Sequence, residues 1–548
     1  MKRWVSLLII LAMMVTLAAC GNGADEQASP SAAVSASLEQ AQDKPDQTPS
    51  SAEPDHPVEQ AVPAERPQQS GPNPLQVRLG RHEESEWTED YTLLSSVEWQ
   101  GIVLGEESAK AFPTLAASLQ QMNAGNYENN LRILNEMLPE AKTAAAETEY
   151  FNGFTSTSEY VVQRADEHIL SVRVNESEYT GSAHPMYWVL GINLDPASGA
   201  RIPLTDVLTD TKSLTEILAQ KIREKYPFEP FTSLEEMLGE YAPEQFTWTL
   251  GYQGITFYFS PYEIASYAAG LLTATIWFDE YPELFVERYT QVPLGGYAIV
   301  LSDYDAVEID LKPGDGKRDV LALSIYGDEY GDLQVAASLN DGEYALEDCR
   351  GYEMIPQLVC LRDGGTDRFF LYIEATAEND FTTIYVYDLN SDGITPGSAL
   401  YGAGFTGVWD EDAGEFGTWY EDVFNNPSEF VLSSIIERLG TWVGTRTYTT
   451  NPKDGSIVPQ MDYYELPDTV MPIVSSVPLE VTMLPGKTKE TLPAGTNFYF
   501  RRTDVDTYAD MELADGRQCR IAILYEGDTP MINGVPEWDC FEELLYAG

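Results

Sequence analysis

The stretch from Tyr179 to Asp206 constrains the fold of this chain more than any other part of its sequence. It opens with the loop Gly181-Ser182-Ala183-His184-Pro185, which contains one of only four histidines. Residues 186–195 are apolar, aromatic and β-branched, as is typical of a strand. The segment Asp195-Pro196-Ala197-Ser198-Gly199 then places Pro and Gly where a tight turn favours them. The pattern predicts a loop, a strand and a turn, with His184 just before the strand.

A second stretch, residues 246–278, belongs with the first and predicts three strands. The segment Pro261-Tyr262-Glu263 follows the middle strand and leads into a loop that ends at Gly270. Hydrophobic spacing also predicts a helix over 106–139, with helical signals toward 149, and another over 213–226. Paired strands are predicted over 155–164 and 168–178. Together these elements predict an α+β domain over residues 77–290.

The two stretches also carry a family resemblance. The Gly181–Pro185 loop with its strand and turn resembles an extracytoplasmic domain of unknown chemistry, and so does the segment GITFYFSPYEIASYAAG at 254–270. In that family the domain forms the outer part of lysozyme-sensing anti-sigma factors and the N-terminal module of some peptidoglycan deacetylases. The resemblance covers roughly residues 88–290, about two fifths of the chain. It implies that this domain binds lysozyme or a wall component.

Three roles are open for His184: fixing the loop that enters the strand, contacting a ligand, or acting as a catalytic base. Catalysis would require an oriented partner within hydrogen-bond reach. Ser182, Asp195 and Asp206 are the neighbouring candidates, but spacing alone does not place them beside the imidazole. Loop structure is the simplest interpretation, because Pro185 stiffens the segment.

Tyr262, Glu263 and Tyr267 form the second candidate site. Aromatic rings beside a carboxylate suit a surface that grips a protein partner or a sugar. The alternative is that these side chains pack a sheet, as aromatic residues commonly do.

The N-terminal sequence predicts where the protein is located in the cell. Lys2 and Arg3 precede an apolar run, and the segment Leu17-Ala18-Ala19-Cys20-Gly21 resembles the bacterial lipobox. Residues 1–19 are therefore predicted to be a lipoprotein signal peptide, with Cys20 lipidated at the outer face of the bacterial cytoplasmic membrane. An ordinary secretory signal ending near a cysteine is the alternative.

Residues 20–76 are rich in Ala, Ser, Pro, Gln and acidic residues, and predict a disordered tether because they cannot bury enough apolar surface to fold. A flexible segment of that length reaches about 40 Å. The whole chain has 32 basic and 88 acidic residues, a formal net charge of −56. This charge argues against binding nucleic acid or anionic lipid head groups and favours cationic partners.

The C-terminal half is predicted to be mostly β. Residues 291–464 predict propeller-like or sandwich strands, and residues 465–548 predict a small SH3-like barrel from short strands and Gly turns. One helix is expected near 427–439, because Asn426-Pro427-Ser428-Glu429 has the pattern of a helix start. Val431, Ile435 and Leu439 would line one face of that helix.

Two acidic loops in this half resemble the calcium loops of integrin-type propellers. The candidate ligands are Asp310, Asp315, Asp319, Asp388, Asn390 and Asp392. Alternating oxygen ligands around a Gly suit calcium. However, Asp310 is out of register and Pro396 replaces an expected acid, and two units do not close a propeller. Ordinary hairpin turns also explain Asp-Gly pairs.

Four cysteines follow Cys20, namely Cys349, Cys360, Cys519 and Cys540. An even number outside the membrane suggests disulfides, and proximity favours Cys349–Cys360 and Cys519–Cys540 among three possible pairings. Four buried thiols are the alternative.

The sequence is compatible with three functions. The first is a non-enzymatic envelope lipoprotein that binds a wall component or a wall-degrading enzyme such as lysozyme. The second is a wall hydrolase with paired carboxylates, which 88 acidic residues leave possible. The zinc module of the deacetylase relatives is missing, because no histidine follows His184. The third is a purely structural interaction lipoprotein.

Overall fold

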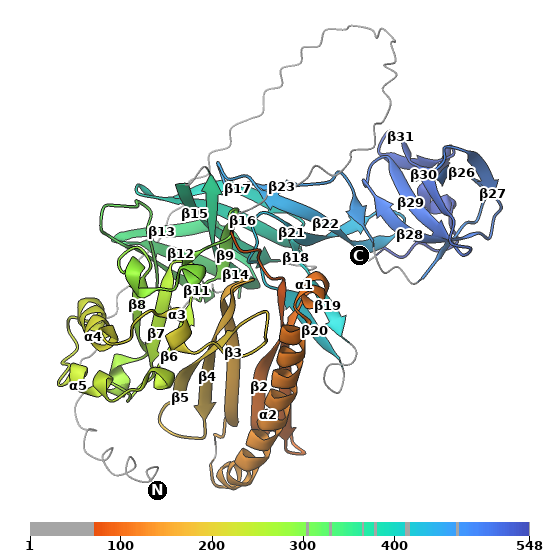
Figure 1. Ribbon diagram of the computed structural model, residues 1–548. Coiled ribbons are helices and arrows are strands. Elements are labelled where there is room, and N and C mark those ends of the chain that lie inside the picture. Colours follow the sequence, from red (N-terminus) through yellow and green to blue (C-terminus); the bar gives the residue numbers. More distant parts are fainter. Residues whose placement is uncertain are drawn as a thin grey trace, which may run out of the picture. The chain divides into compact units, whose positions relative to one another are not determined.

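The computed structural model describes most of the chain after residue 70 (Figure 1). The described residues are 71–148, 150–302, 306–327, 331–363, 366–377, 381–410, 417–466 and 471–546. The predicted signal peptide, Cys20 and nearly all of the tether lie outside them. An α+β N-terminal region followed by a mostly β half is confirmed. Within these residues, no helix combines the length and apolar character needed to cross a membrane.

A seven-stranded sheet forms the frame of the N-terminal region, in the order β19-β20-β1-β2-β3-β4-β5. Its strands are β1 (Val77–Trp87), β2 (Leu93–Leu104), β3 (Phe154–Asp166), β4 (Ile169–Tyr179), β5 (Met186–Leu194), β19 (Gly407–Asp410) and β20 (Thr418–Asp422). Only β2 and β3 pair in parallel, because the long helix between them carries the chain back across the sheet. The predicted antiparallel pair at Ala165-Asp166-Glu167 is confirmed as β3 and β4.

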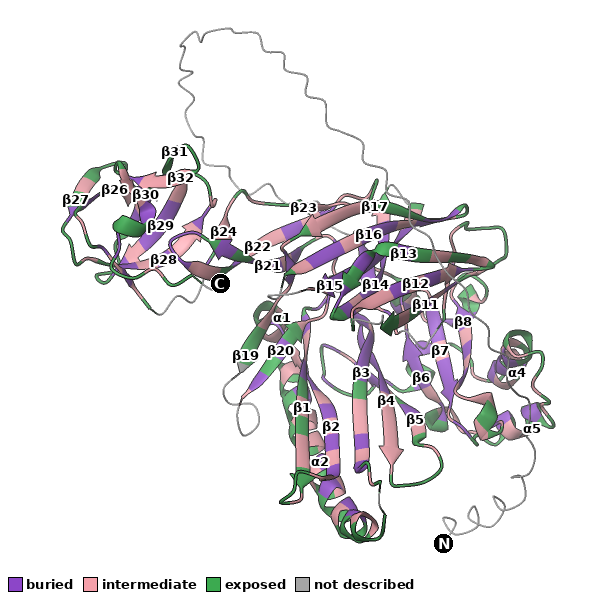
Figure 2. Cartoon of the chain, turned by 180° about the vertical axis from the view of Figure 1, so that it is seen from behind, coloured by how far each residue is buried: buried purple, intermediate pink, exposed green. Residues whose placement is uncertain are grey.

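The helix that crosses between β2 and β3 is α2 (Pro113–Glu147), preceded by the short α1 (Glu106–Ala111). It continues through Pro139, as the helical signals toward residue 149 indicate. Its buried face consists of apolar residues at helical spacing, which pack on the sheet: Leu115, Leu119, Leu134, Met137 and Ala141. Figure 2 shows the strands opposite, where β4 is buried over its first half and half-buried over its second.

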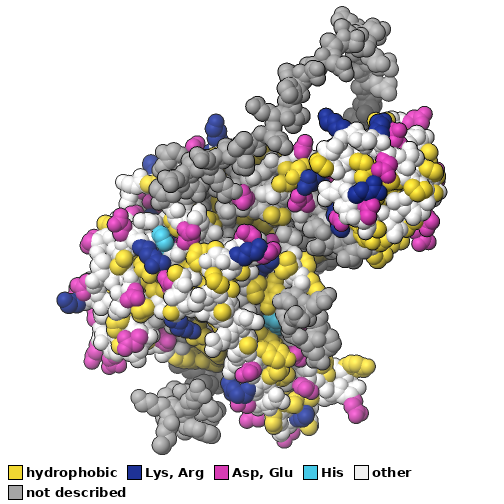
Figure 3. Space-filling view, turned by 45° about the vertical axis from the view of Figure 1, so that its right-hand side comes forward, with side chains coloured by type: hydrophobic (Ala, Val, Ile, Leu, Met, Phe, Trp, Pro, Cys, Tyr) yellow, Lys and Arg dark blue, Asp and Glu magenta, His cyan; other side chains and the backbone are white. Residues whose placement is uncertain are grey.

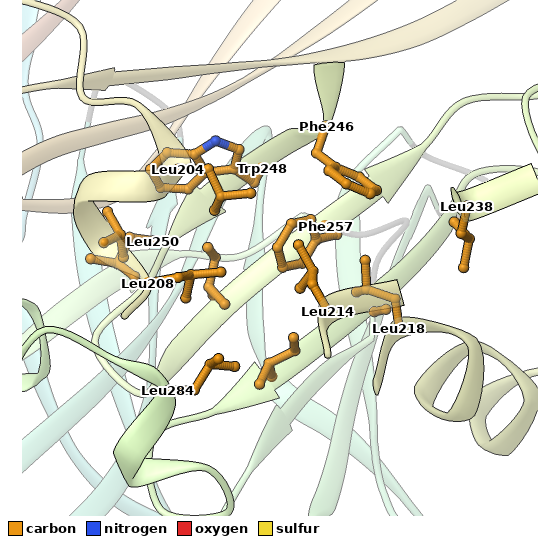
Figure 4. Packing of buried hydrophobic residues seen from close by; sticks show 14 of the residues in the cluster. Leu204, Leu208, Leu214, Leu218, Leu238, Phe246, Trp248, Leu250, Phe257 and Leu284 are labelled. Atoms are coloured by element: carbon orange, nitrogen blue, oxygen red, sulfur yellow. The ribbon is translucent and has the colours of Figure 1, made fainter. Parts of the chain in front are cut away.

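A second layer lies against β5 and contains β6 (Thr247–Leu250), β7 (Gly254–Phe259) and β8 (Leu272–Trp277). These are the three strands predicted over residues 246–278. The helices α3 (Leu204–Val207), α4 (Leu214–Lys225), α5 (Leu234–Gly239) and α6 (Glu287–Thr290) accompany them. Figure 4 shows how leucines from α3 and α4 meet Trp248, Leu250 and Phe257 of the sheet in one core.

The two layers touch closely at Gly191. A Cβ there would lie 2.1 Å from the carbonyl oxygen of Trp248, so only glycine fits. Asn193 donates to that same oxygen from Nδ2 at 2.8 Å and accepts from Ser171 Oγ at 2.6 Å. The buried Asn193 and Ser171 therefore hold β6 against β4 and β5.

Two antiparallel sheets follow and share one core, which is a sandwich and not a set of propeller blades. The four-stranded sheet contains β10 (Val307–Ile309), β11 (Asp319–Gly327), β12 (Leu333–Leu339) and β13 (Gly342–Gly351). The five-stranded sheet contains β9 (Gly296–Val300), β14 (Glu353–Asp363), β15 (Thr366–Thr376), β16 (Thr382–Asn390) and β17 (Gly393–Tyr401). The sandwich alternative of the prediction is therefore the one observed.

The helix predicted over 427–439 is wrong, because this segment contains the strand β21 (Phe430–Glu437). Val431 and Ile435 are four residues apart, a spacing that suits both a helix and one face of a strand. Residues 430, 432, 434 and 436 are buried alternately, which is strand periodicity. Asn426 Oδ1 accepts the Ser428 N–H at 3.1 Å, so the expected helix cap closes a turn.

The second face of the five-stranded sheet packs against β21 and β22 (Thr441–Thr450). The strand β22 pairs with β23 (Ile457–Pro459) to form a hairpin around Lys453-Asp454-Gly455. From β18 (Gly404–Phe405) and β21 the sheet continues through β22, β24 (Tyr464–Glu465), β28 (Asn497–Thr503), β29 (Tyr508–Leu513), β30 (Gln518–Ala522), β26 (Leu479–Leu484) and β27 (Lys489–Leu492). The strands described over 471–546 thus follow an open path, and the expected barrel is not closed among them.

The four cysteines are free thiols, so the predicted disulfides Cys349–Cys360 and Cys519–Cys540 are wrong. Each pair does share a core, as proximity suggested. Cys349 and Cys360, however, belong to strands of different sheets, β13 and β14. The Cys540 Sγ faces the carbonyl oxygens of Ile532 and Val535, each at 3.8 Å. The four thiols therefore act as small apolar side chains inside two cores.

Candidate functional site

The two stretches that organise the sequence meet at one end of the N-terminal region. The loop before β5 contains His184, and the loop between β7 and β8 contains Tyr262, Glu263 and Tyr267. Tyr267 Oη donates to the Pro185 carbonyl at 2.7 Å. The Val189 N–H donates to Ser260 Oγ at 3.2 Å. These bonds hold the two loops together, so three of the predicted residues belong to one aromatic surface.

Four rings form this surface, named here the aromatic loop surface: His184, Tyr187, Tyr262 and Tyr267. The His184 imidazole stacks on Tyr267 with centroids 3.8 Å apart and planes at 25°. Tyr187 meets the same ring edge-on at 5.7 Å, and Tyr262 lies tilted at 5.7 Å. Such geometries stabilise aromatic clusters. Tyr267 is therefore the centre of the cluster.

Tyr262 presents the most exposed ring of the surface. Its side chain is 57% exposed, and its φ of 71° is in the left-handed region that non-glycine residues rarely adopt. Neither exposure nor strain of this kind is required for packing a sheet. Strained backbone conformations cluster at active sites and ligand clamps, so Tyr262 is a candidate for ligand contact.

Glu263 belongs to the loop but serves its turn. Its carboxylate accepts the Ser260 N–H at 2.8 Å, and its own N–H donates to the Ser260 carbonyl at 3.0 Å. Partial desolvation of the carboxyl raises the pKa of Glu263, and the Ser260 bond opposes the shift; the residue as a whole is exposed, so the effect is small. Glu263 thus supports the position of Tyr262.

The surroundings of His184 contain no catalytic relay among the described residues. Its Nδ1 lies 3.1 Å from the Pro185 carbonyl, and Ser182 Oγ donates to the His184 carbonyl at 2.6 Å. Asp195 accepts from Ser198 at 2.8 Å and pairs with Arg288 at 3.1 Å. Asp206 lies in the first turn of α3. The geometry favours loop structure and ligand contact as the roles of His184.

A polar groove of about 660 Å³ lies between α2 and the half-buried ends of β3, β4 and β5. We call it the amide groove, since Asn126, Asn129, Asn130 and Gln245 line it together with Tyr160, Glu176 and Trp248. Asn126 donates from Nδ2 to Tyr160 Oη at 2.6 Å, and Ser158 Oγ donates to Glu176 at 3.1 Å. Burial raises the pKa of Tyr160 to about 12 and raises that of Glu176. Leu190 of β5 lines the groove, and Tyr187 of the aromatic loop surface belongs to the same strand. The groove and the aromatic loop surface are therefore connected through β5.

Sequence reasoning missed Tyr187 and the amide groove. Asn126, Asn129 and Asn130 are spaced three and four residues apart, which places them on one face of a helix. That spacing was the available signal. Tyr187 could be found from its position three residues after His184, at the start of the predicted strand.

The acidic loops considered for calcium are engaged with the protein itself. Asp310 pairs with Arg318 at 3.0 Å, and Asp388 pairs with Arg368 at 2.6 Å. The other candidates cap turns: Asp315 accepts the Lys317 N–H, Asp319 the Leu311 N–H and Asn390 the Asp392 N–H. Over the described ranges no group of three acidic, histidine or cysteine side chains is arranged to hold a metal ion. The structure thus gives these loops a structural role.

Two family models match the chain, both in the N-terminal region. Residues 108–187 match the model described as Deacetylase PdaC, and residues 205–279 match that of a protein of unknown function, DUF3298. The resemblance seen in the loop motifs is thereby confirmed. Both the aromatic loop surface and the amide groove take residues from the two matched segments. No curated protein matches the chain.

Two solved structures are similar to part of the chain. A DUF3298 family member from Bacteroides fragilis is 19% identical, with a TM-score of 0.30, and the match covers 40% of this chain and 96% of that one. A DUF3298 family protein from Pseudomonas aeruginosa is 16% identical, with a TM-score of 0.27, and the match covers 40% and 98% respectively.

Proposed function

We propose that this protein is a non-enzymatic lipoprotein of the bacterial cell envelope. Cys20 would anchor it to the outer face of the cytoplasmic membrane. Its N-terminal region would bind a wall component or a wall-degrading enzyme such as lysozyme. The observation that carries the proposal is the aromatic loop surface, a set of partly exposed rings built from both matched segments, in which Tyr262 is exposed and has a strained backbone. The deacetylase match supports a place at the wall, where such modules act.

The chemistry of the surface suits this class of ligand. Tyrosine rings offer large, rigid contact area with a polar tip, which serves both sugar rings and protein partners. The net charge of −56 favours a cationic partner over an anionic one. In Figure 3, basic side chains are scattered among more numerous acidic ones over the visible face. We therefore assign specificity to the loops rather than to a single charged patch.

The test is calorimetry with residues 71–548 against lysozyme and, separately, purified muropeptides. We expect saturable binding of at least one, weakened at least tenfold by Tyr262→Ala or Tyr267→Ala. Tyr91→Ala is the matched control, because Tyr91 is also an exposed tyrosine, 87% exposed, with a positive φ of 63°. That variant should bind normally.

Two outcomes would contradict the proposal. Absence of binding to both ligands would leave the interaction-lipoprotein alternative. Release of muropeptide fragments by the chain would instead favour the wall-hydrolase alternative.

A further inference from the structure

A second cleft, of about 780 Å³, lies between the five-stranded sheet and the hairpin of β19 and β20. We propose that it binds a small organic ammonium ion, held by Glu374 and Gln357 at the floor and by the indoles of Trp409 and Trp419 at the wall. We call it the acidic cleft. This assignment is independent of the aromatic loop surface, with which it shares no residue.

Strand register places the floor groups side by side. Ile355 of β14 is opposite Glu374 of β15, and Gln357 is opposite Tyr372. Gln357 and Glu374 are thus diagonal neighbours on one face, a relation in which Cα atoms lie about 7–8 Å apart. One compact ligand can touch both.

The wall comes from the hairpin. Along β20 the buried Thr418 and Tyr420 alternate with the exposed Trp419 and Glu421, so the indole and the carboxylate project to the same side. Trp409 is directly opposite Trp419 across the two strands. Trp409 is 54% exposed and Trp419 is 47% exposed. The cleft therefore has two accessible aromatic faces close to its carboxylates.

The buried amide oxygen of Gln357 is the feature that indicates a ligand. The residue is only 3% exposed, it lines the cleft, and its Oε1 has no hydrogen-bond partner among the described residues. A buried acceptor left without a donor lowers the stability of the folded protein by about 1–3 kcal/mol. Such groups are therefore rare in native proteins. A donor from a bound molecule would satisfy this acceptor.

The charges of the cleft select a cation. Three of the charged residues that line the cleft are engaged within the protein. Arg81 pairs with Glu98 at 2.8 Å, Asp422 pairs with Arg78 at 2.5 Å, and Glu159 accepts from Asn175 Nδ2 at 3.2 Å. Glu353, Glu374 and Glu421 have no Lys or Arg partner in the described part of the chain. Glu374 is 9% exposed, and within the described ranges its carboxyl accepts only the Phe405 N–H, at 2.9 Å. An anion would be repelled by this set of acceptors.

An ammonium group matches these features better than a neutral ligand or a metal ion does. It carries three donors and no acceptor, which complements Gln357 Oε1 and the carboxylates. It is also attracted to tryptophan faces. The acidic side chains of the cleft do not form a metal-binding group within the described residues.

The test compares two probes of the same shape, benzylamine and benzyl alcohol, with residues 71–548. Binding is followed by calorimetry and by the fluorescence of the tryptophans. We expect benzylamine to bind at least tenfold more tightly than the alcohol, and to be weakened by salt. Binding of glucosamine is compared with binding of N-acetylglucosamine as a second pair. Tighter binding of glucosamine would show that the cleft accepts an ammonium group attached to a sugar.

Variants then locate the site. Glu374→Gln and Gln357→Met should each weaken benzylamine binding at least fivefold. Glu236→Gln, which changes an exposed carboxylate on α5, should have no effect. Tyr262→Ala should also leave amine binding intact, which separates this result from the test of the aromatic loop surface. Equal binding of amine and alcohol, absence of saturable amine binding, or unchanged binding by both cleft variants would overturn the proposal.

Discussion

Glu374 shows how one buried carboxyl links stability to pH. Its burial, with smaller contributions from the charges of Glu421 and Glu353, raises its pKa to about 7 from an ordinary 4.5. The folded chain therefore holds this proton more tightly than the unfolded chain does. The stabilising contribution is complete below pH 4.5 and is lost as pH rises through 7.

Since one pKa unit corresponds to about 1.4 kcal/mol, Glu374 should lower the free energy of unfolding by about 3 kcal/mol between pH 4.5 and 8. Glu374→Gln should remove this slope and raise the stability at pH 8. Urea unfolding at a series of pH values measures both. An identical pH dependence in the two proteins would show that the carboxyl is not buried in this way.

The cysteines give a second prediction at this scale. Burial raises the pKa of Cys349 and Cys519 to about 12 and of Cys540 to about 11, and it also raises that of Cys360. Thiolates are the reactive form. Iodoacetamide should therefore leave residues 71–548 unmodified when folded and label four thiols in denaturant without a reductant. Labelling of fewer than four thiols in denaturant would show that a disulfide is present.

At the scale of elements, the sequence predicted strands and helices well where one periodicity was clear. The three strands of 246–278 and the helix α4 are examples, and α4 begins directly after Ser213. The helix prediction over residues 427–439 was wrong for two reasons. Residues four apart lie on one face of a helix and also on one face of a strand, and the Pro-containing turn at 426–429 has the same sequence pattern as a helix start. The site was predicted in part. Loop motifs identified His184, Tyr262 and Tyr267, but the acidic cleft depends on strand pairing across more than 300 residues, which local patterns do not contain.

Gly191 offers a test of the contact between β5 and β6. Gly191→Ala should destabilise the chain by about 1–3 kcal/mol, because its Cβ would overlap the Trp248 carbonyl oxygen. Gly125→Ala is the opposite control, since Gly125 lies inside α2 with nothing within 4 Å of the added carbon. It should stabilise by about 0.5–1 kcal/mol. Thermal unfolding compares the two, and equal shifts would refute the close approach.

At the scale of the whole molecule, the sheet depends on distant parts of the chain. β1 pairs with β2 on one side and with β20 on the other, where Arg78 faces Asp422. Asn425 Nδ2 adds bonds to the carbonyls of Leu75 at 2.8 Å and Ala165 at 3.2 Å. The N-terminal region is therefore completed by residues from the C-terminal half.

A fragment of residues 71–290 should consequently be less stable than residues 71–548 and should self-associate, because it leaves β1 as a bare edge strand. Sedimentation and urea unfolding of both measure this. A monomeric fragment that keeps the stability of its region would show that the β1–β20 pairing is dispensable.

The pairing of β1 with β20 also sets an order of events while the chain is made. A chain that emerges from its N-terminus presents β1 long before residue 418 is available. For that interval the open edge must remain protected from other chains, either by its charged side chains or by chaperones. The last step in building the N-terminal region is thus the arrival of a hairpin encoded more than 300 residues later.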